Sequence, residues 1–180
     1  MSAARDDGGD LTHLGESGEA RMVDVGGKAE TFRRALARGR IRMAPDTLER
    51  IVAGDAPKGD VLGTARLAGI QAGKRTGELI PLCHVIPGAS ISVSLEADPE
   101  LPGIVVLAEA SVTGRTGVEM EALVAAAVAL LTVYDMAKAL ERGMVLEDVR
   151  LVSKEGGRSG VWAADDASEG SSEPGPTGGR

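Results

Sequence analysis

The longest apolar run of the chain lies in residues 116–140, where ionisable groups occur only near the two ends. Thr116 and Glu119 form the Thr-x-x-Glu pattern of a capping box, which predicts that a helix begins at this threonine. Nearly every face of the helix would be apolar, so we expect it to be buried on several sides. Its uncharged part, residues 122–134, falls short of the ~20 residues of a membrane span, so we do not expect a membrane helix.

Alternation of apolar and polar positions predicts strands on both sides of this helix. Residues 90–97 and part of 103–113 alternate with a period of two, and they are separated by a cluster of turn residues. This pattern indicates a β-hairpin that leads into the long helix. After the stop at Arg142-Gly143, residues 145–152 predict a returning strand.

The first half of the chain predicts two further helices. Residues 45–53 form a short helical pattern with proline near its start, and residues 61–74 form a longer one. Residues 21–25 alternate enough to form a short strand.

Residues 30–43 fit either a basic helix or a strand. Arg38, Arg40 and Arg42 alternate with glycine and apolar residues, which favours the strand. The arginines are most simply a solvated edge, although one of them could reach a phosphate.

These elements together predict an α+β fold, with a ferredoxin-like antiparallel sheet that carries helices packed on one face. The length of 180 residues suits one domain. We expect this catalytic domain to span residues 11–162. Residues 1–10 and 163–180 are acidic or rich in glycine, serine and proline, so we expect disordered tails there.

Composition excludes several classes of function. The net charge of −7 comes largely from the two tails, and there is no basic tract and only three aromatic side chains, so nucleic-acid binding is not expected. The single cysteine excludes an internal disulfide and a multi-thiolate zinc site. Without an apolar leader segment, a cytoplasmic protein is the default expectation.

Two positions at the far end of the long helix carry candidate chemistry. Asp135 and Lys138 are three residues apart and therefore share a helix face. They form either a helix-end ion pair or an acid/base pair for catalysis. Lys58 lies directly before the predicted helix at 61–74, where it could bind a phosphate or simply be a solvated turn residue.

Two loops carry further candidates. Cys83 and His84 lie in an apolar loop between two prolines, where the imidazole could contact substrate or be a core histidine. A metal is not expected there, because the chain offers few other soft ligands. Lys154 and Arg158 flank a glycine-rich stretch, which could be a phosphate cradle or a plain loop.

The length of the long helix constrains how these groups combine. Fourteen residues separate Glu121 from Asp135, which places the two carboxylates ~21 Å apart on an unbroken helix. One small substrate cannot easily contact both ends. We therefore expect a homo-oligomer whose active sites lie between subunits.

Three long segments are jointly similar to a known family. They are KGDVLGTARLAGIQAGKRTGELIPLCH, TGRTGVEMEALVAAAVALLTVYDMAKAL and VRLVSKEGGRSG, and the similarity runs from about residue 11 to residue 160. The chain resembles the cyclic pyranopterin monophosphate synthase family of molybdenum cofactor biosynthesis.

This resemblance implies a lyase that converts (8S)-3′,8-cyclo-7,8-dihydroguanosine 5′-triphosphate to cyclic pyranopterin monophosphate and releases pyrophosphate. It also implies a homohexamer built as a trimer of dimers, with its substrate made by a radical SAM GTP cyclase. No cofactor is implied, apart from a Mg²⁺ ion that could accompany the triphosphate.

The resemblance assigns catalysis to Asp135 and Lys138. The substrate-binding residues that it implies are Leu82, Cys83, His84, Glu119, Met120, Glu121, Lys58 and Lys154. Arg158 stands where relatives have lysine, so it is left outside the core site. Alternative functions are a metal-assisted nucleotide hydrolase and a non-catalytic nucleotide-binding subunit.

Overall fold

The computed structural model describes residues 25–165. The predicted tail at 1–10 and nearly all of the predicted strand at 21–25 lie outside these residues. The predicted C-terminal tail also lies outside them, except for its first three residues. Strand β5 (Trp162–Ala163) crosses this predicted boundary and pairs with β4 (Val145–Glu155), and the Ala164 amide donates to the Val152 carbonyl oxygen at 2.9 Å.

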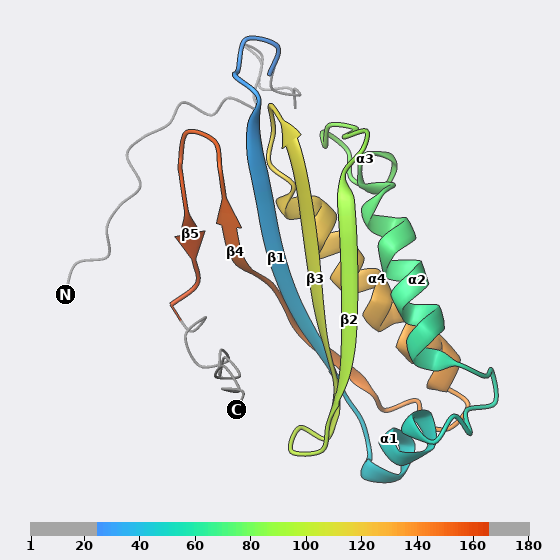
Figure 1. Ribbon diagram of the computed structural model, residues 1–180. Helices are drawn as coiled ribbons and strands as arrows, with labels where there is room; N and C mark the ends of the chain where they lie inside the picture. The colour runs from blue at the N-terminus through green and yellow to red at the C-terminus, as the bar shows by residue number, and fades with distance from the viewer. Residues whose placement is uncertain (1–24, 166–180) are drawn as a thin grey trace, which may run out of the picture.

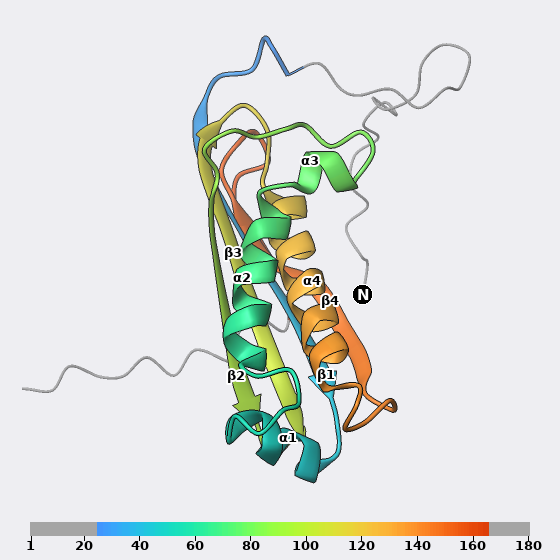
Figure 2. The same cartoon turned by 90° about the vertical axis from the view of Figure 1, so that its right-hand side faces the viewer.

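Five antiparallel strands form a single sheet with the order β2-β3-β1-β4-β5 (Figure 1). The bounds of the four longer strands are β1 Thr31–Arg42, β2 Ser90–Asp98, β3 Gly103–Gly114 and β4 Val145–Glu155. Two long helices, α2 (Val61–Gly73) and α4 (Glu119–Ala137), lie side by side on one face of the sheet (Figure 2). This arrangement confirms the predicted α+β fold of ferredoxin-like kind.

Two short helices lie at opposite ends of this helical layer (Figure 2). Helix α1 (Pro45–Val52) was predicted from its proline, whereas α3 (Thr76–Leu79) was not. The four residues of α3 and the two of β5 are too few to produce a periodic pattern, so the sequence could not reveal them.

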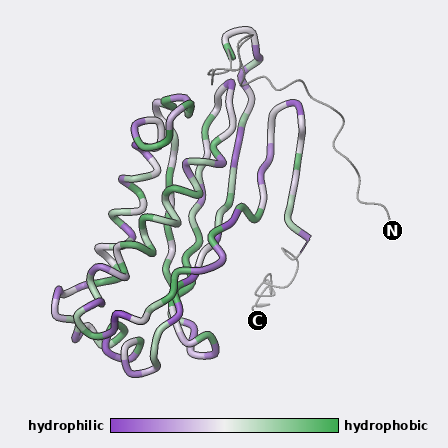
Figure 3. The backbone as a smooth tube through the Cα atoms, turned by 180° about the vertical axis from the view of Figure 1, so that it is seen from behind, coloured by the Kyte–Doolittle hydropathy of each residue, from purple (hydrophilic) through white to green (hydrophobic). Residues whose placement is uncertain are grey.

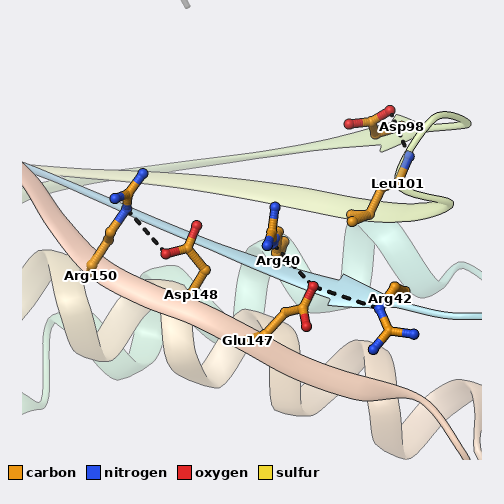
Figure 4. A network of polar contacts seen from close by, with 7 residues as sticks. All are labelled: Arg40, Arg42, Asp98, Leu101, Glu147, Asp148 and Arg150. Carbon is orange, nitrogen blue, oxygen red and sulfur yellow. Dashed lines mark hydrogen bonds and ion pairs between the residues drawn. The ribbon is translucent and has the colours of Figure 1, made fainter. Parts of the chain in front are cut away.

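Strand β1 resolves the ambiguity of residues 30–43 in favour of a strand, but it corrects the placement of the arginines. It lies between β3 and β4, so the arginines cover the open face of a central strand and not a sheet edge. Arg40 and Arg42 place Nε 3.1 and 3.7 Å from Glu147 Oε1 (Figure 4). The other face of β1 packs in the core through Ala35, Ala37 and Ile41.

The hairpin turn after β2 is closed by a side chain. Asp98 Oδ1 accepts a hydrogen bond from the backbone amide of Glu100 at 2.9 Å. It accepts a second from the amide of Leu101 at 3.2 Å (Figure 4). An aspartate in this position replaces the backbone partners that the turn residues would otherwise lack. The turn therefore fixes the register of β2 against β3.

Helix α4 begins later than the capping box predicted. Val118 is its N-cap residue and no side chain caps the helix, so the Thr116 capping box is wrong. The predicted helix also ran to residue 140, whereas α4 ends at Ala137 with Lys138 as its C-cap. A lysine at this end is favourable, because the last carbonyl groups carry partial negative charge.

Helix α4 is the core of the molecule. By length and composition it is the one helix within residues 25–165 that could cross a membrane, but 56% of its most apolar stretch is buried in the fold. Ala122, Ala125, Ala129 and Val133 are fully buried. The strands that it covers alternate between hydrophobic and hydrophilic colour (Figure 3), as expected for a sheet with one covered face.

The two long helices approach each other closely because α2 has glycines on the contact side. A side-chain β-carbon at Gly69 would lie 2.8 Å from the Ala125 carbonyl oxygen, and one at Gly73 would lie 3.0 Å from that of Glu121. Both separations are tighter than ordinary van der Waals contacts. The two glycines therefore set the distance between α2 and α4.

Candidate functional site

A cavity of about 350 Å³ lies where the loop after α3 meets the start of α4. Six predicted site residues line it together: Leu82, Cys83, His84, Glu119, Met120 and Glu121. They come from two segments about 35 residues apart in the chain. The fold therefore brings together the two substrate-binding groups of residues that the resemblance implied.

The loop that carries Cys83 is held in an unusual backbone conformation. Leu82 has a φ of 65°, a left-handed value that residues with a β-carbon rarely adopt. The turn is closed by a hydrogen bond from the Cys83 amide to the Ile80 carbonyl oxygen at 3.2 Å. Strained backbone of this kind occurs preferentially where a loop holds functional side chains.

Burial raises the pKa of both the acid and the thiol in this cavity. Burial raises the pKa of Glu121, which is only 4% exposed, and the charge of Glu119 raises it further. Burial and the charge of Glu121 also raise the pKa of the Cys83 thiol. A thiol with a raised pKa is a poorer nucleophile, whereas a carboxyl group with a raised pKa is a better proton donor or acceptor than an ordinary carboxylate.

A second cavity of about 740 Å³ adjoins the first, and the two share Lys28, Thr116 and Gly117 in their linings. Its cationic residues are Lys28, Arg33, Arg115 and Arg158. Cationic side chains around one cavity suit a polyphosphate, which carries several negative charges and many acceptor oxygens. We name these two spaces the acid/base cavity and the cationic cavity.

Sequence reasoning missed three of these four cations. Lys28, Arg33 and Arg115 were not candidates, and Arg158 was set aside from the core site. The Gly26-Gly27-Lys28 run was a usable signal, because glycines next to a lysine are typical of anion-binding loops. Arg33 gave no comparable signal, since it is one of several arginines in β1 and its neighbours carry no glycine.

Arg33 ties the start of β1 to the end of β3. Its Nε donates to the Gly114 carbonyl oxygen at 2.9 Å, and its Nη2 donates to that of Arg115 at 3.2 Å. The connection between β3 and α4 therefore rests on this guanidinium. The same connection lines both cavities through Thr116 and Gly117.

The two predicted catalytic residues, Asp135 and Lys138, lie at the opposite end of α4. Lys138 Nζ is 2.7 Å from Asp135 Oδ1, and Lys58 Nζ is 2.6 Å from Asp135 Oδ2. Hydrogen bonds from Lys138 and then Lys58 lower the pKa of Asp135 to about 2. The three side chains are about half exposed, so this lysine cluster lies on the surface and is open to a ligand or to another subunit.

The unbroken helix keeps the two ends apart. Its 19 residues include both Glu121 and Asp135, so the separation of ~21 Å expected from the helical rise applies. Lys154 lies elsewhere again, on β4, where its ammonium contacts the Ser159 hydroxyl. Ser159 lines the cationic cavity, whereas Lys154 itself does not.

Within residues 25–165 there is no group of three or more His, Cys, Asp or Glu side chains arranged to hold a metal ion. The metal-assisted hydrolase considered from the sequence therefore has no specific support in this part of the chain.

Comparison with known proteins agrees with this geometry. A family model described as the MoaC family matches residues 22–157. A protein of Novosphingobium aromaticivorans named cyclic pyranopterin monophosphate synthase is 63% identical over 155 residues, 86% of this chain and 98% of that protein.

Two further relatives carry the same name. The protein of Methylobacterium nodulans is 61% identical over 157 residues, 87% of this chain and 98% of its own length. The protein of Brucella ovis is 56% identical over 158 residues, 88% of this chain and 96% of its own length. With a family match over residues 22–157 and relatives that align over nearly their whole lengths, the chain belongs to the MoaC family.

Proposed function

We propose that the protein is a cyclic pyranopterin monophosphate synthase. It would rearrange (8S)-3′,8-cyclo-7,8-dihydroguanosine 5′-triphosphate to cyclic pyranopterin monophosphate and release pyrophosphate, in molybdenum cofactor biosynthesis. The observation that carries this proposal is the junction of the acid/base cavity with the cationic cavity. The reaction needs proton transfer at ring atoms and cations around a leaving pyrophosphate, and the two cavities offer these separately.

The proposal gives the substrate a single orientation across the two cavities. The triphosphate belongs among the cations of the cationic cavity, because burying several negative charges without partners costs much free energy. The ring system then lies in the acid/base cavity, near His84, Glu119 and Glu121. Leu82 and Met120 supply apolar contact to the ring, and Cys83 remains a neutral thiol beside it. Lys154, which contacts Ser159 at the rim, would assist with the phosphates.

The proposal completes each active site with a second subunit. Asp135 and Lys138 lie at the far end of α4, and Lys58, from the turn before α2, contacts Asp135 there. None of the three would therefore reach a substrate in the cavities of their own chain. A neighbouring chain would present its lysine cluster to them, with Lys138 as proton donor or acceptor and Asp135 as the anion that orients it. The corresponding assembly is a homohexamer of three dimers.

The proposal also defines the setting of the reaction. It places the enzyme in the cytoplasm and assigns it the product of a radical SAM GTP cyclase as substrate. It requires no resident cofactor, and Mg²⁺ enters only as a companion of the triphosphate.

The decisive experiment supplies the cyclic dihydro-GTP intermediate to the purified protein. We expect cyclic pyranopterin monophosphate and pyrophosphate in equal amounts, measured by mass spectrometry and by a coupled pyrophosphate assay. Binding without either product would leave a non-catalytic nucleotide-binding subunit as the function.

The matched variant is Lys138→Ala. Lys138 is half exposed at the helix end, so its loss should lower the melting temperature only slightly, as expected for an exposed ion pair. We expect turnover to fall by about 10²-fold to 10⁴-fold, the range typical of a lost general acid or base. Turnover at the wild-type rate would remove Lys138 from the mechanism.

A further inference from the structure

The side chain of Arg115 points to a role that differs from those of the other cations of the cationic cavity. Its Nη1 donates to the Gly26 carbonyl oxygen at 3.0 Å, and its Nε lies 3.5 Å from Glu30 Oε1. Both partners belong to residues 26–30, the segment directly before β1. The guanidinium therefore faces a protein segment with two of its nitrogens.

That segment carries Lys28, which lines both cavities. Two consecutive glycines precede Lys28, so the backbone there is conformationally permissive and has no side chains of its own to pack. Within residues 25–165 the Lys28 ammonium forms no ion pair. Its position therefore depends on what holds the segment around it.

The backbone at Arg115 is hydrogen-bonded to the sheet. The carbonyl groups of Gly114 and Arg115 both accept hydrogen bonds from Arg33, so the connection between β3 and α4 is attached to β1. Arg115 extends this attachment outward to the 26–30 segment. Arg33, Arg115 and Glu30 thus form a chain of contacts from the sheet to the lysine-bearing segment.

We propose that Arg115 is a positioning residue that, together with Glu30, holds the 26–30 segment so that Lys28 reaches a bound polyphosphate. This inference rests on the proposed function, because it assumes that the cationic cavity takes the triphosphate. It assigns to Arg115 an effect exerted through Lys28 and not through direct contact with phosphate.

Substitution of Glu30 tests the proposal, because two explanations predict opposite changes in the affinity for an anion. Glu30→Gln removes a negative charge near a cationic cavity, so electrostatics alone would strengthen binding of an anion. A loosened segment would weaken it instead. The probe is inorganic triphosphate, titrated into the full-length protein by calorimetry at fixed ionic strength.

We expect the dissociation constant of Glu30→Gln to rise about threefold, the size expected for losing an exposed ion pair. Glu49→Gln on α1 makes the same charge change at the opposite end of the molecule and should leave binding unchanged. Unchanged or tighter binding by Glu30→Gln would overturn the proposal.

A double-mutant cycle then separates positioning from direct contact. Arg115→Met should weaken triphosphate binding about fivefold to tenfold in the wild-type background, and by less than twofold when Lys28→Met is already present. Equal losses in both backgrounds would mean that Arg115 binds the phosphate itself, and would overturn the proposal. Arg66→Met on α2 is the charge-matched control, because Arg66 lines neither cavity.

These measurements do not depend on turnover. If the protein bound triphosphate with the expected pattern but formed no pyranopterin, the role of Arg115 would stand and the proposed function would fail. If the protein formed product but the losses in the cycle were additive, the proposed function would stand and the role of Arg115 would fail.

Discussion

Asp135 contacts two lysines that come from different elements, and this makes it a permanent anion under physiological conditions. Lys138 and Lys58 each lie within hydrogen-bonding distance of one carboxylate oxygen. With its pKa lowered to about 2, the carboxyl group does not exchange protons near neutral pH. In the proposed mechanism its part is therefore to orient the lysines, and proton transfer at this end is assigned to Lys138 or Lys58.

The titration of Asp135 tests this assignment. Because its folded-state pKa lies below the unfolded value of ~3.9, the lysine contacts contribute stability above that value and lose it as pH falls towards 2. We expect Lys58→Met to return the pKa part of the way to its ordinary range, as followed by carboxyl carbon chemical shifts. Lys74→Met, remote from this cluster, is the control, and an identical titration in both variants would show that Lys58 does not contact Asp135 in solution.

The effect of Glu121 on stability changes with pH in the opposite direction to that of Asp135. Burial raises its pKa, so its ionised form destabilises the fold, and this penalty grows as pH rises through the raised pKa. Glu121→Gln should therefore melt a few degrees above the wild type at neutral pH, with a smaller difference at pH 4, where both forms are largely neutral. Calorimetric melting at the two pH values checks this. A difference that is larger at pH 4 would contradict a desolvated carboxylate.

Sequence spacing could predict only part of these residue-level contacts. The Asp135–Lys138 pair follows directly from their three-residue spacing on a helix. Lys58 is 77 residues from Asp135 in the chain, so their contact follows only once α2 and α4 are known to lie side by side. The hydrogen bonds from Arg33 to the carbonyl oxygens of Gly114 and Arg115 likewise follow only once β1 is known to pair with β3.

At the scale of elements, the packing of α2 on α4 depends on the absence of side chains at Gly69 and Gly73. Gly69→Val would place atoms within 3 Å of the Ala125 carbonyl oxygen and force the helices apart. We expect a loss of about 1–3 kcal/mol in the free energy of unfolding, typical of overpacking. Urea denaturation measures it. Thr64→Val on the exposed side of α2 is the control, and equal stability of the two variants would contradict close packing here.

Most elements could be predicted from the spacing of their apolar positions, whereas the short elements α3 and β5 could not. Strands β1, β2 and most of β3 alternate because one face of the sheet is covered and the other is open, so their pattern survives in the sequence. The capping box failed for a different reason. Thr116 and Gly117 line the two cavities, and the helix begins only after them, at an N-cap valine whose side chain cannot bond the backbone.

At the scale of the whole molecule, α4 divides the predicted catalytic machinery into two half-sites. The cavities lie at its first turn and the lysine cluster at its last, as the family resemblance and the helical rise together required. Two half-sites on one chain can form complete sites when two chains meet in opposite orientation about a two-fold axis. A dimer of this kind would contain two equivalent active sites.

Mixing of subunits tests this arrangement. Glu121→Gln damages the cavity end and Lys138→Ala the cluster end, so each homodimer should be inactive. A mixed dimer would hold one site with both substitutions and one with neither, so an equimolar mixture after subunit exchange should recover about a quarter of wild-type activity. Sedimentation would verify that exchange occurred. No recovery in an exchanged mixture would place each active site within a single chain.

Because α4 carries a half-site at each end, its length is fixed as strictly as its composition. Inserting a single codon in its middle would turn everything beyond the insertion by about 100° and shift it by ~1.5 Å. Asp135 would then leave Lys58, and polar residues would turn towards the sheet. The hairpin turn between β2 and β3 has no such constraint, since it lies outside both cavities and the lysine cluster. In this gene, insertions and deletions should therefore be rarer in the long helix than in the hairpin turn.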